Sequence, residues 1–475
     1  MRPVSVQPVP AGPRAAAGAL EFPPGFVWGA ATAAFQVEGS TTADGRTESI
    51  WDAFCRQPGR VVGGDTGEPG ADHYLRMRSD VALMRELGLG AYRFSIAWPR
   101  VRPDGGGPNH RGIAFYDALV DELLDNGITP VATLYHWDLP QALEDAGGWT
   151  SRDTAARFAE YADTATAVLG DRVSMWTTLN EPWCSAFLGY GSGVHAPGRT
   201  DPAAALAAAH HLLLAHGLAV PVIRSNVPGA VAGITLNLFP VLPASPSAAD
   251  ADAARRVDAL QNRLFLDPVL RGGYPPDLLS DVAHLGFAEH VRPGDAQVIA
   301  APVDFVGVNF YRDHHVAAGG AGERAGGAWP GSEHLVFPPR GLPVTAAGWE
   351  IRAEGLRDLL VDLDRGYPGV TWYVTENGAA FDDRVEAGQV FDHDRRDYLE
   401  GHLRAAHAAI AAGVDLRGYF AWSLLDNFEW AEGYAKRFGI VHVDYATQAR
   451  AVKLSGRWYA KVAAENRVPG GAEVR

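Results

Sequence analysis

Two apolar, β-prone runs of the sequence each end on a carboxylate beside an amide. Residues 178–183 read TLNEPW, and residues 371–377 read TWYVTEN. Because Asn and Pro are ordinary turn residues, a solvated turn is one interpretation of the first motif. The other interpretation is that the strand ends hold Glu181 and Glu376 as a working pair, since one carboxyl group can donate a proton while another attacks or activates.

Polar and aromatic side chains close most of the other β-prone runs in the same way. The set comprises Gln36, Glu38, Arg93, His136, Trp137, Asp138, Asn180, Asn309, Tyr311, Asn377, Trp422, Glu429 and Trp430. Amide, imidazole and carboxylate groups fix hydroxyls, and flat rings bind the apolar faces of sugars. Cleavage of a glycosidic bond requires two carboxyl groups, one as proton donor and one as nucleophile or base. The set therefore predicts a sugar hydrolase.

These side chains can meet only if their strands end at one edge of a sheet. Candidate strands lie at residues 26–32, 91–98, 128–135, 173–180, 230–237, 303–311, 371–377 and 416–425. Amphipathic stretches separate them: in residues 79–88, Val81, Met84 and Leu87 share a helical face, and Gly88 is placed to end the helix. The alternation favours a single (β/α)₈ barrel with its active site at the C-terminal face of the strands. A doubly wound sheet is the alternative.

The length and composition are consistent with one large domain. The chain has 475 residues, of which 47% are hydrophobic and 10% aromatic, and no break in composition divides it. We expect a catalytic domain over residues 21–465. Prolines and Arg14 interrupt residues 1–20, which predicts a flexible tail instead of a signal peptide, and residues 466–475 are predicted to be a C-terminal tail.

Charge and cysteine content restrict the partners and the compartment. Lys and Arg number 41 against 56 Asp and Glu, a net charge of −15, which disfavours nucleic acid and anionic membranes as partners. Cys55 and Cys184 are too few for a disulfide framework and are predicted to be buried free thiols. The most apolar window, residues 203–220, suits a packed helix better than a membrane span. We therefore expect a cytoplasmic protein, and assembly into a homo-oligomer stays open.

The sequence lacks the usual metal and phosphate motifs. It contains no HExxH, CxxC or GxSxG motif and no Walker A loop, so we expect neither a metal nor a cofactor. The Gly-rich stretch 319–331 lacks the flanking strand and helix of a phosphate-binding loop and is predicted to be a mobile loop.

A series of motifs resembles one known family. In order, FVWGAATAAFQVEG, YRFSIAWPR, LYHWDLP, TLNEPW, GVHAPG, VGVNFY, YVTENGAA and YFAWSLLDNFEWAEGYAKRFGIVHVDY are similar to segments of glycoside hydrolase family 1, the retaining β-glucosidase family. The resemblance covers nearly everything from about residue 22 to 460. It implies a (β/α)₈ barrel with catalytic glutamates after strands four and seven. It also implies hydrolysis of terminal β-D-glucosyl residues through a covalent glycosyl-enzyme, and a part in cellulose degradation.

The resemblance implies a role for each residue of the catalytic pair and its neighbours. Glu181 resembles the acid/base and Glu376 resembles the nucleophile. Arg93 and Tyr311 resemble the cation and phenol beside the nucleophile, and Asn309 is expected to support the nucleophile region. Apolar walls and the charge of Glu376 should raise the pKa of Glu181, whereas Arg93 and Tyr311 should favour the ionised form of Glu376 and lower its pKa.

The same resemblance implies the substrate-binding residues. Asn180 is implied at the sugar 2-hydroxyl and Gln36, His136 and Glu429 at the 3-, 4- and 6-hydroxyls, with Trp137 and Trp430 alongside, Trp422 as the floor and Trp349 as the platform for the departing group. The retained carboxylate at Glu429 favours neutral glucosides over 6-phosphorylated sugars, which it would repel, and predicts that β-galactosides and β-fucosides are cleaved too.

Some features depart from the family pattern, and two alternatives remain. The N-terminal tail is longer than the motifs need, Trp372 stands where an aliphatic residue is common, and the Gly-rich stretch leaves the aglycone preference open. A transglycosylase would pass the same intermediate to a sugar or alcohol. A catalytically silent sugar-binding protein is disfavoured because both Glu181 and Glu376 are present.

Overall fold

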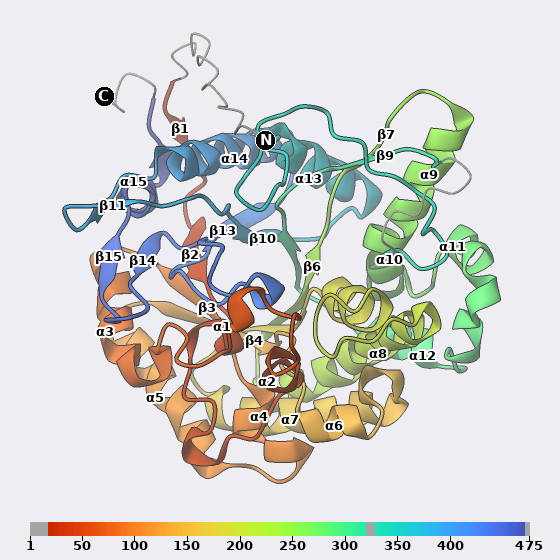
Figure 1. Ribbon diagram of the computed structural model, residues 1–475, viewed down its shortest axis with the longest axis horizontal. Helices are drawn as coiled ribbons and strands as arrows, with labels where there is room; N and C mark the ends of the chain where they lie inside the picture. Colours follow the sequence, from red (N-terminus) through yellow and green to blue (C-terminus); the bar gives the residue numbers. More distant parts are fainter. Residues whose placement is uncertain (1–17, 320–327, 471–475) are drawn as a thin grey trace.

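The computed structural model describes residues 18–319 and 328–470, and its centre is a closed barrel of parallel strands (Figure 1). The strands are β2 (Val27–Ala31), β3 (Ala91–Ser95), β4 (Thr129–Tyr135), β5 (Met175–Asn180), β6 (Val231–Asn237), β8 (Phe305–Asn309), β10 (Trp372–Asn377) and β13 (Leu416–Trp422). Each lies within one of the predicted runs. Pairing of β13 with β2 and of β10 with β8 closes the ring, so the (β/α)₈ barrel is confirmed and the doubly wound sheet is excluded.

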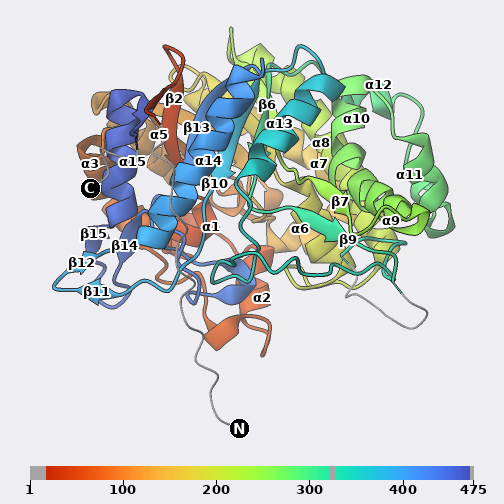
Figure 2. The same cartoon turned by 90° about the horizontal axis from the view of Figure 1, so that it is seen from above.

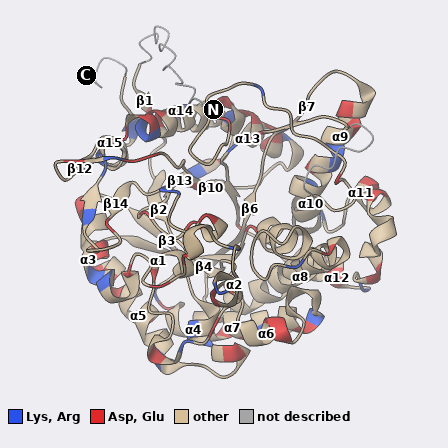
Figure 3. Cartoon of the chain, in the orientation of Figure 1, with Lys and Arg blue, Asp and Glu red and all other residues tan. Residues whose placement is uncertain are grey.

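Helices surround the barrel (Figures 1 and 2). They are α1 (Ala34–Val37), α2 (Ile50–Cys55), α3 (His73–Glu86), α4 (Trp98–Val101), α5 (His110–Asp125), α6 (Gln141–Asp145), α7 (Arg152–Leu169), α8 (Pro202–Asn226), α9 (Ala248–Asp258), α10 (Leu264–Arg271), α11 (Pro276–Asp281), α12 (Asp295–Ile299), α13 (Glu354–Gly366), α14 (His393–Ala411) and α15 (Leu454–Glu465). Figure 3 shows charged residues gathered on outer helices such as α3, α5 and α11. The strands are largely buried because the helices cover their outer side.

Two helices test particular predictions. The helix predicted near residues 79–88 is α3, which begins earlier than expected. Val81 and Met84 are fully buried, and Gly88 follows the helix with a φ of 65°, as expected for a glycine just beyond a C-cap. Among the described residues α8 alone is long and apolar enough to cross a membrane, yet 83% of its most apolar window is buried inside the protein. It is therefore the packed helix that the sequence predicts.

The two ends of the described chain meet in a small sheet. Strand β1 (Leu20–Glu21) pairs antiparallel with β16 (Arg467–Val468), and Val468 is fully buried. The indole N–H of Trp28 donates to Asn466 Oδ1 at 2.8 Å. The packed domain therefore extends a few residues past the predicted boundaries at 21 and 465. The remainder of the predicted tails, residues 1–17 and 471–475, lies outside the described residues.

Further small strands follow the C-terminal ends of the barrel strands, and one of them, β9, contributes His314 to the lining of the site. β7 (Val241–Pro243) pairs with β9 (His314–Val316), β11 (Val385–Glu386) with β12 (Gln389–Val390), and β14 (Val441–Val443) with β15 (Arg450–Val452). Most of the predicted mobile loop, residues 320–327 of the Gly-rich stretch, lies outside the described residues.

Candidate active site

Glu181 and Glu376 line one cavity of about 310 Å³ at the C-terminal ends of β5 and β10. Glu181 directly follows the last residue of β5 and adopts a left-handed φ of 47°. A left-handed conformation is unfavourable for a residue other than glycine and persists only where the surrounding structure holds it. The turn therefore ends the strand and presents the carboxyl group to the cavity. Of the two interpretations of the TLNEPW motif, the structure favours a carboxyl group held in a site over a solvated turn.

Glu376 is held by one cation and one phenol. Arg93 Nη1 donates to Glu376 Oε1 at 2.6 Å, and Tyr311 Oη donates to Oε2 at 2.7 Å. The other terminal nitrogen of Arg93 donates to Asn180 Oδ1 at 2.6 Å. Both carboxylate oxygens of Glu376 thus accept from donors on or just after other strands, which fixes the orientation of the group. Arg93 and Tyr311 lie beside Glu376, where the sequence predicted them.

Glu181 has only uncharged partners. Asn309 Nδ2 donates to its Oε1 at 2.6 Å, and the Cys184 thiol donates to its Oε2 at 3.1 Å. Asn309 also accepts from Thr375 Oγ1 at 2.8 Å, so it connects Glu181 to the strand that carries Glu376. Asn309 therefore supports both glutamates. Its hydrogen bonding lowers the pKa of Glu376, in line with the expected support of the nucleophile region, and its side chain also reaches from β8 to the acid/base candidate.

Burial and charge raise the pKa of Glu181, as predicted. Burial is the larger cause and the nearby charge of Glu376 the second, and together they raise the pKa of Glu181 to about 8. A carboxyl group with that pKa keeps its proton near neutral pH, which is the requirement for a general acid.

The prediction of a lowered pKa for Glu376 is wrong. Burial raises the pKa of Glu376 above its ordinary value, and the opposing effects of Arg93, Tyr311 and Asn309 only reduce that rise. Removal of a carboxylate from water is costly even beside a cation. Because Arg93 forms its ion pair with Glu376 and not with Glu181, Glu376 is the carboxyl group that ionises first, and its charge then holds the proton on Glu181.

Aromatic rings and an imidazole form the opposite wall of the cavity. The ring of His136 lies 5.9 Å from those of both Trp422 and Trp430 and within 19° of parallel to each. Trp137 donates from its indole N–H to the Asn180 backbone oxygen at 2.9 Å. Trp137 and Trp430 have φ values of 77° and 51°, so this wall, like Glu181, is built on residues in the left-handed conformation.

Several buried polar atoms beside this wall have no hydrogen-bond partner within the described residues, among them Gln36 Oε1, His136 Nδ1 and Glu429 Oε2. A buried polar atom is normally satisfied, so these atoms suit hydroxyl groups of a bound sugar. Burial, followed by the charge of Arg93, holds the pKa of His136 well below its usual value. Burial, followed by the charges of Glu376 and Glu181, raises the pKa of Glu429 to about 8.

The segment that carries Glu429 and Trp430 is fixed from both sides. On the barrel side, Gln36 Nε2 donates to Asn427 Oδ1 at 3.0 Å and to the Phe428 backbone oxygen at 2.7 Å. On the other side, the carboxylate of Asp426 forms ion pairs within a buried group of charged side chains.

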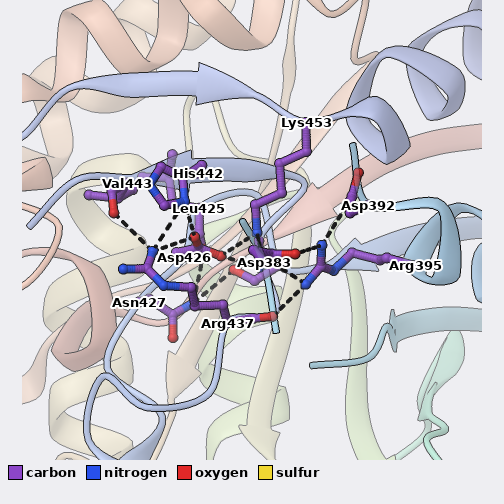
Figure 4. Close-up of polar contacts among 12 residues, drawn as sticks. Asp383, Asp392, Arg395, Leu425, Asp426, Asn427, Arg437, His442, Val443 and Lys453 are labelled. Carbon is purple, nitrogen blue, oxygen red and sulfur yellow. Dashed lines mark hydrogen bonds and ion pairs between the residues drawn. The ribbon is translucent and has the colours of Figure 1, made fainter. Parts of the chain in front are cut away.

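We call this group the anchor cluster: Asp383, Asp392, Arg395, Asp426, Arg437, His442 and Lys453 (Figure 4). Lys453 Nζ donates to Asp426 at 2.7 Å and also contacts Asp383, and Arg437 donates to Asp426 at 2.7 Å. Lys453 and Asp426 are fully buried. Removal of one partner would leave an uncompensated charge, so the cluster holds Asp426, and with it the sugar-binding segment, in one position.

The mouth of the cavity is aromatic. Trp349 lines it, half-buried, with its ring 5.5 Å from that of Tyr311 and 6.0 Å from that of Phe438. Trp183 also lines it and lies 5.5 Å from the ring of Trp329. Flat apolar faces at the mouth suit the departing part of a glycoside.

Three strand-end residues to which the family resemblance gives no role do not line the cavity. Glu38 accepts from Tyr116 Oη at 2.6 Å and from Arg100. Asn377 donates to the Phe310 backbone oxygen at 2.7 Å. Asp138 is buried elsewhere, with a pKa raised to about 8 by burial. Gln36, Arg93, Asn180 and Asn309 are buried beside the cavity, and the other predicted site residues line it.

The sequence analysis missed several lining residues: Trp183, Cys184, His195, Asn237, Arg312, His314 and Glu432. Cys184 was read only as a buried free thiol, and it is one, but its position three residues after Glu181 in a helical turn also brings it to the carboxyl group. Asn237 is the last residue of β6, so a polar residue at a strand end was the signal that could have found it. The others follow strand ends at distances that no sequence period marks.

The fold and the cavity define a class of protein. The site lies at the C-terminal face of a (β/α)₈ barrel and has two carboxyl groups with unlike partners, an aromatic wall and unsatisfied polar atoms. These features meet the requirements of a glycoside hydrolase. Among the described residues no group of His, Cys, Asp and Glu could hold a metal ion.

Comparison with known proteins agrees with this class. The model of glycosyl hydrolase family 1 matches residues 19–468, and the chain belongs to that family. It is 53% identical to the thermostable β-glucosidase B of Thermobispora bispora over 459 residues, covering 96% of this chain and 93% of that protein. It is 47% identical to a bifunctional β-D-glucosidase/β-D-fucosidase of Bifidobacterium breve, covering 94% and 98%. The crystal structure of a psychrophilic β-glucosidase of Micrococcus antarcticus superposes with a TM-score of 0.92 at 54% identity, covering 94% and 98%.

Proposed function

We propose that the protein is a retaining β-glucosidase that hydrolyses terminal non-reducing β-D-glucosyl residues from β-glucosides and short oligosaccharides. The observation that carries this proposal is the unlike environment of the two glutamates in one cavity. Glu376 has an arginine and a phenol as donors, whereas Glu181 has only neutral donors and a pKa raised to about 8.

In the first step, ionised Glu376 attacks the anomeric carbon while Glu181 gives its proton to the leaving oxygen. Arg93 and Tyr311 aim the carboxylate, and Asn180, held by Arg93 and Asn309, is placed to hydrogen-bond the sugar 2-hydroxyl as positive charge develops on the ring. The product of this step is a covalent glycosyl-enzyme and a free aglycone.

In the second step, Glu181 is ionised and removes a proton from water, which attacks the anomeric carbon and releases Glu376. Once the ester forms, Glu376 carries no charge. Burial still raises the pKa of Glu181, but the second contribution, from the charge of Glu376, disappears, so the pKa falls. The same carboxyl group therefore changes from acid to base without moving. If a sugar or alcohol replaces the water, the result is transglycosylation.

The sugar-binding wall favours neutral glucose. Glu429 Oε2, which has no hydrogen-bond partner among the described residues, can accept from the 4- and 6-hydroxyls. In its ionised form Glu429 repels a 6-phosphate. A single carboxylate can also reach an axial 4-hydroxyl, so we propose activity on β-galactosides and β-fucosides as well. The printed name of the Bifidobacterium breve relative, a β-D-glucosidase/β-D-fucosidase, supports the second substrate.

Proton NMR of the first sugar released tests the stereochemistry. A β-glucoside should yield the β-anomer first, since two displacements at one carbon retain configuration. Initial appearance of the α-anomer would contradict the assignment of Glu376 as nucleophile.

Azide rescue tests the two roles separately. Glu376→Ala should abolish hydrolysis of β-glucosides because no ester can form. Glu181→Ala should retain activity on glucosides with acidic phenol leaving groups, which need little protonation, and azide should accelerate its second step to give a β-glucosyl azide. The matched control is Glu376→Ala with added azide. Direct attack by azide should give an α-glucosyl azide in this variant only, as expected if Glu376 is the nucleophile.

We further propose a cytoplasmic location and a part in the breakdown of cellulose-derived oligosaccharides. The two unpaired buried thiols, Cys55 and Cys184, suit a reducing compartment. Fractionation of cells with an antibody against the protein, together with growth on cellobiose after deletion of the gene, tests both parts of this proposal.

A further inference from the structure

Arg312 is a cation at the mouth of the cavity with no role in the mechanism above. It follows Tyr311, the donor to Glu376, and lines the same cavity. Its guanidinium carbon lies 5.3 Å from the ring centroid of Trp349. The side chain is half-buried and lies beside Trp349, the expected platform for the departing part of a substrate.

Within residues 18–319 and 328–470, Arg312 has no ion pair and donates no hydrogen bond. The carboxylate next to it in the sequence is unavailable, because Asp313 is buried and accepts from Arg340 and Arg352 at 3.2 and 2.7 Å. Arginine is among the residues least often buried without a partner. The neighbouring Asp313 has two arginine partners, whereas Arg312 has no carboxylate partner. The unpaired guanidinium is therefore a candidate to bind a ligand.

No carboxylate among the described residues forms an ion pair with Arg312, although four glutamates line the same cavity. Burial lowers the pKa of Arg312 to about 10, so the group remains a cation at neutral pH but is poorly stabilised by the protein. No other Lys or Arg lines the cavity in the described part of the chain. A ligand that brought an anionic group here would gain an ion pair without breaking an existing one.

We infer that Arg312 and Trp349 form a recognition site for aromatic aglycones that carry a carboxylate. The inference rests on the proposed function, because it concerns the part of the substrate that leaves. An aromatic ring can lie against the apolar mouth formed by Trp349 and Trp183. The planar guanidinium has the geometry for a two-point hydrogen bond to a carboxylate.

The competing interpretation is that Arg312 binds hydroxyl groups of a second sugar. A carboxylate is favoured because a neutral hydroxyl does not compensate the desolvated charge, whereas an anion does. The net charge of −15 also repels anionic substrates at long range, so their recognition requires a local cation, and Arg312 is placed to provide it.

The test compares 4-carboxyphenyl and 4-carbamoylphenyl β-D-glucoside, which differ in charge but little in shape. The measured quantity is the ratio of the two kcat/KM values, in the wild type, Arg312→Leu and Arg312→Lys. Leaving-group reactivity is the same for each enzyme, so it cancels when ratios are compared. The matched control is Arg365→Leu, which removes a cation from an exposed position on α13.

Arg312→Leu should lower the carboxyl-to-carbamoyl ratio about 10-fold, the loss expected for about 1.4 kcal/mol of a charge-assisted hydrogen bond. Arg312→Lys should lower it less, and Arg365→Leu should leave it unchanged. Added salt should lower the ratio in every enzyme that keeps a cation at position 312, and it should not lower it in Arg312→Leu. Activity of each variant on 4-nitrophenyl β-glucoside reports correct folding.

Two results would overturn the inference. One is an unchanged ratio in Arg312→Leu while the wild type hydrolyses both substrates. The other is a loss confined to cellobiose, which would assign Arg312 to a second sugar. Failure of the wild type on every β-glucoside is a different outcome, since it would refute the proposed function itself and the inference with it.

Discussion

The hydrogen bond from Tyr311 to Glu376 can be removed with little other change. Tyr311→Phe deletes one oxygen atom and leaves the ring, which packs against Trp349 at 5.5 Å. Glu376 Oε1 keeps its bond to Arg93 at 2.6 Å, whereas Oε2 loses the donor at 2.7 Å. The carboxylate then has one fixed oxygen and one free to rotate away from the attacking position.

The size and sign of the effect follow from the burial of Glu376, which is 3% exposed. A hydrogen bond to a charged group contributes about 1.5–3 kcal/mol, which corresponds to a fall in kcat/KM of roughly 10- to 150-fold. The phenol favours the ionised form and so lowers the pKa of Glu376. Its loss raises that pKa, and the acid limb of the kcat/KM profile should move to higher pH.

Initial rates with 4-nitrophenyl β-glucoside across the acid limb would measure both effects. The matched control is Tyr135→Phe, because Tyr135 is buried and its oxygen accepts from Trp149 Nε1 at 2.9 Å, away from the two glutamates. The control should lose thermal stability and keep the acid limb. If Tyr311→Phe lowers kcat/KM without moving the acid limb, the phenol does not stabilise the charge on Glu376 and the reasoning fails.

Three further predictions address other parts of the site. Glu429→Gln should lose most activity on β-glucoside and gain none on 6-phospho-β-glucoside; faster turnover of the phosphorylated substrate in the wild type would refute our interpretation of Glu429. The thiol of Cys184 lowers the pKa of Glu181, so Cys184→Ala should raise that pKa and move the alkaline limb of kcat/KM to higher pH, while Cys184→Ser keeps a donor and should not. Lys453→Met should destabilise the fold by about 3–5 kcal/mol, seen as a lower thermal midpoint, whereas the exposed change Lys461→Met should have almost no effect.

The barrel was predictable because its signals are local. Each strand is a short apolar run that ends on a polar residue, and one buried ring needs no more information than the number and spacing of such runs. Glu181 and Glu376 could be found for the same reason, since both stand where a strand ends. The ends of the domain could not be found this way, because the pairing of β1 with β16 joins segments at opposite ends of the chain.

The electrostatics of the site were only half predictable. Apolar walls and a nearby charge act in one direction on Glu181, so the sign of its shift was clear. For Glu376, burial raises the pKa whereas Arg93 and Tyr311 lower it. The sign of the net shift depends on how deeply the carboxyl group is buried, which the sequence does not show. Arg312 escaped prediction because its importance lies in a missing partner, a property that only the arrangement of its neighbours can reveal.

Closure of the barrel has a consequence for how the chain is made. The ring is completed by pairing β2 with β13, where Val27 lies beside Gly418. During synthesis from the N-terminus, the edge of β2 that pairs with β13 therefore stays unpaired until nearly the whole domain has left the ribosome. Unpaired strand edges are the surfaces through which partly folded chains associate. A chain that already carries Glu181 and Glu376 but still lacks its last strand therefore has such an unpaired edge at β2.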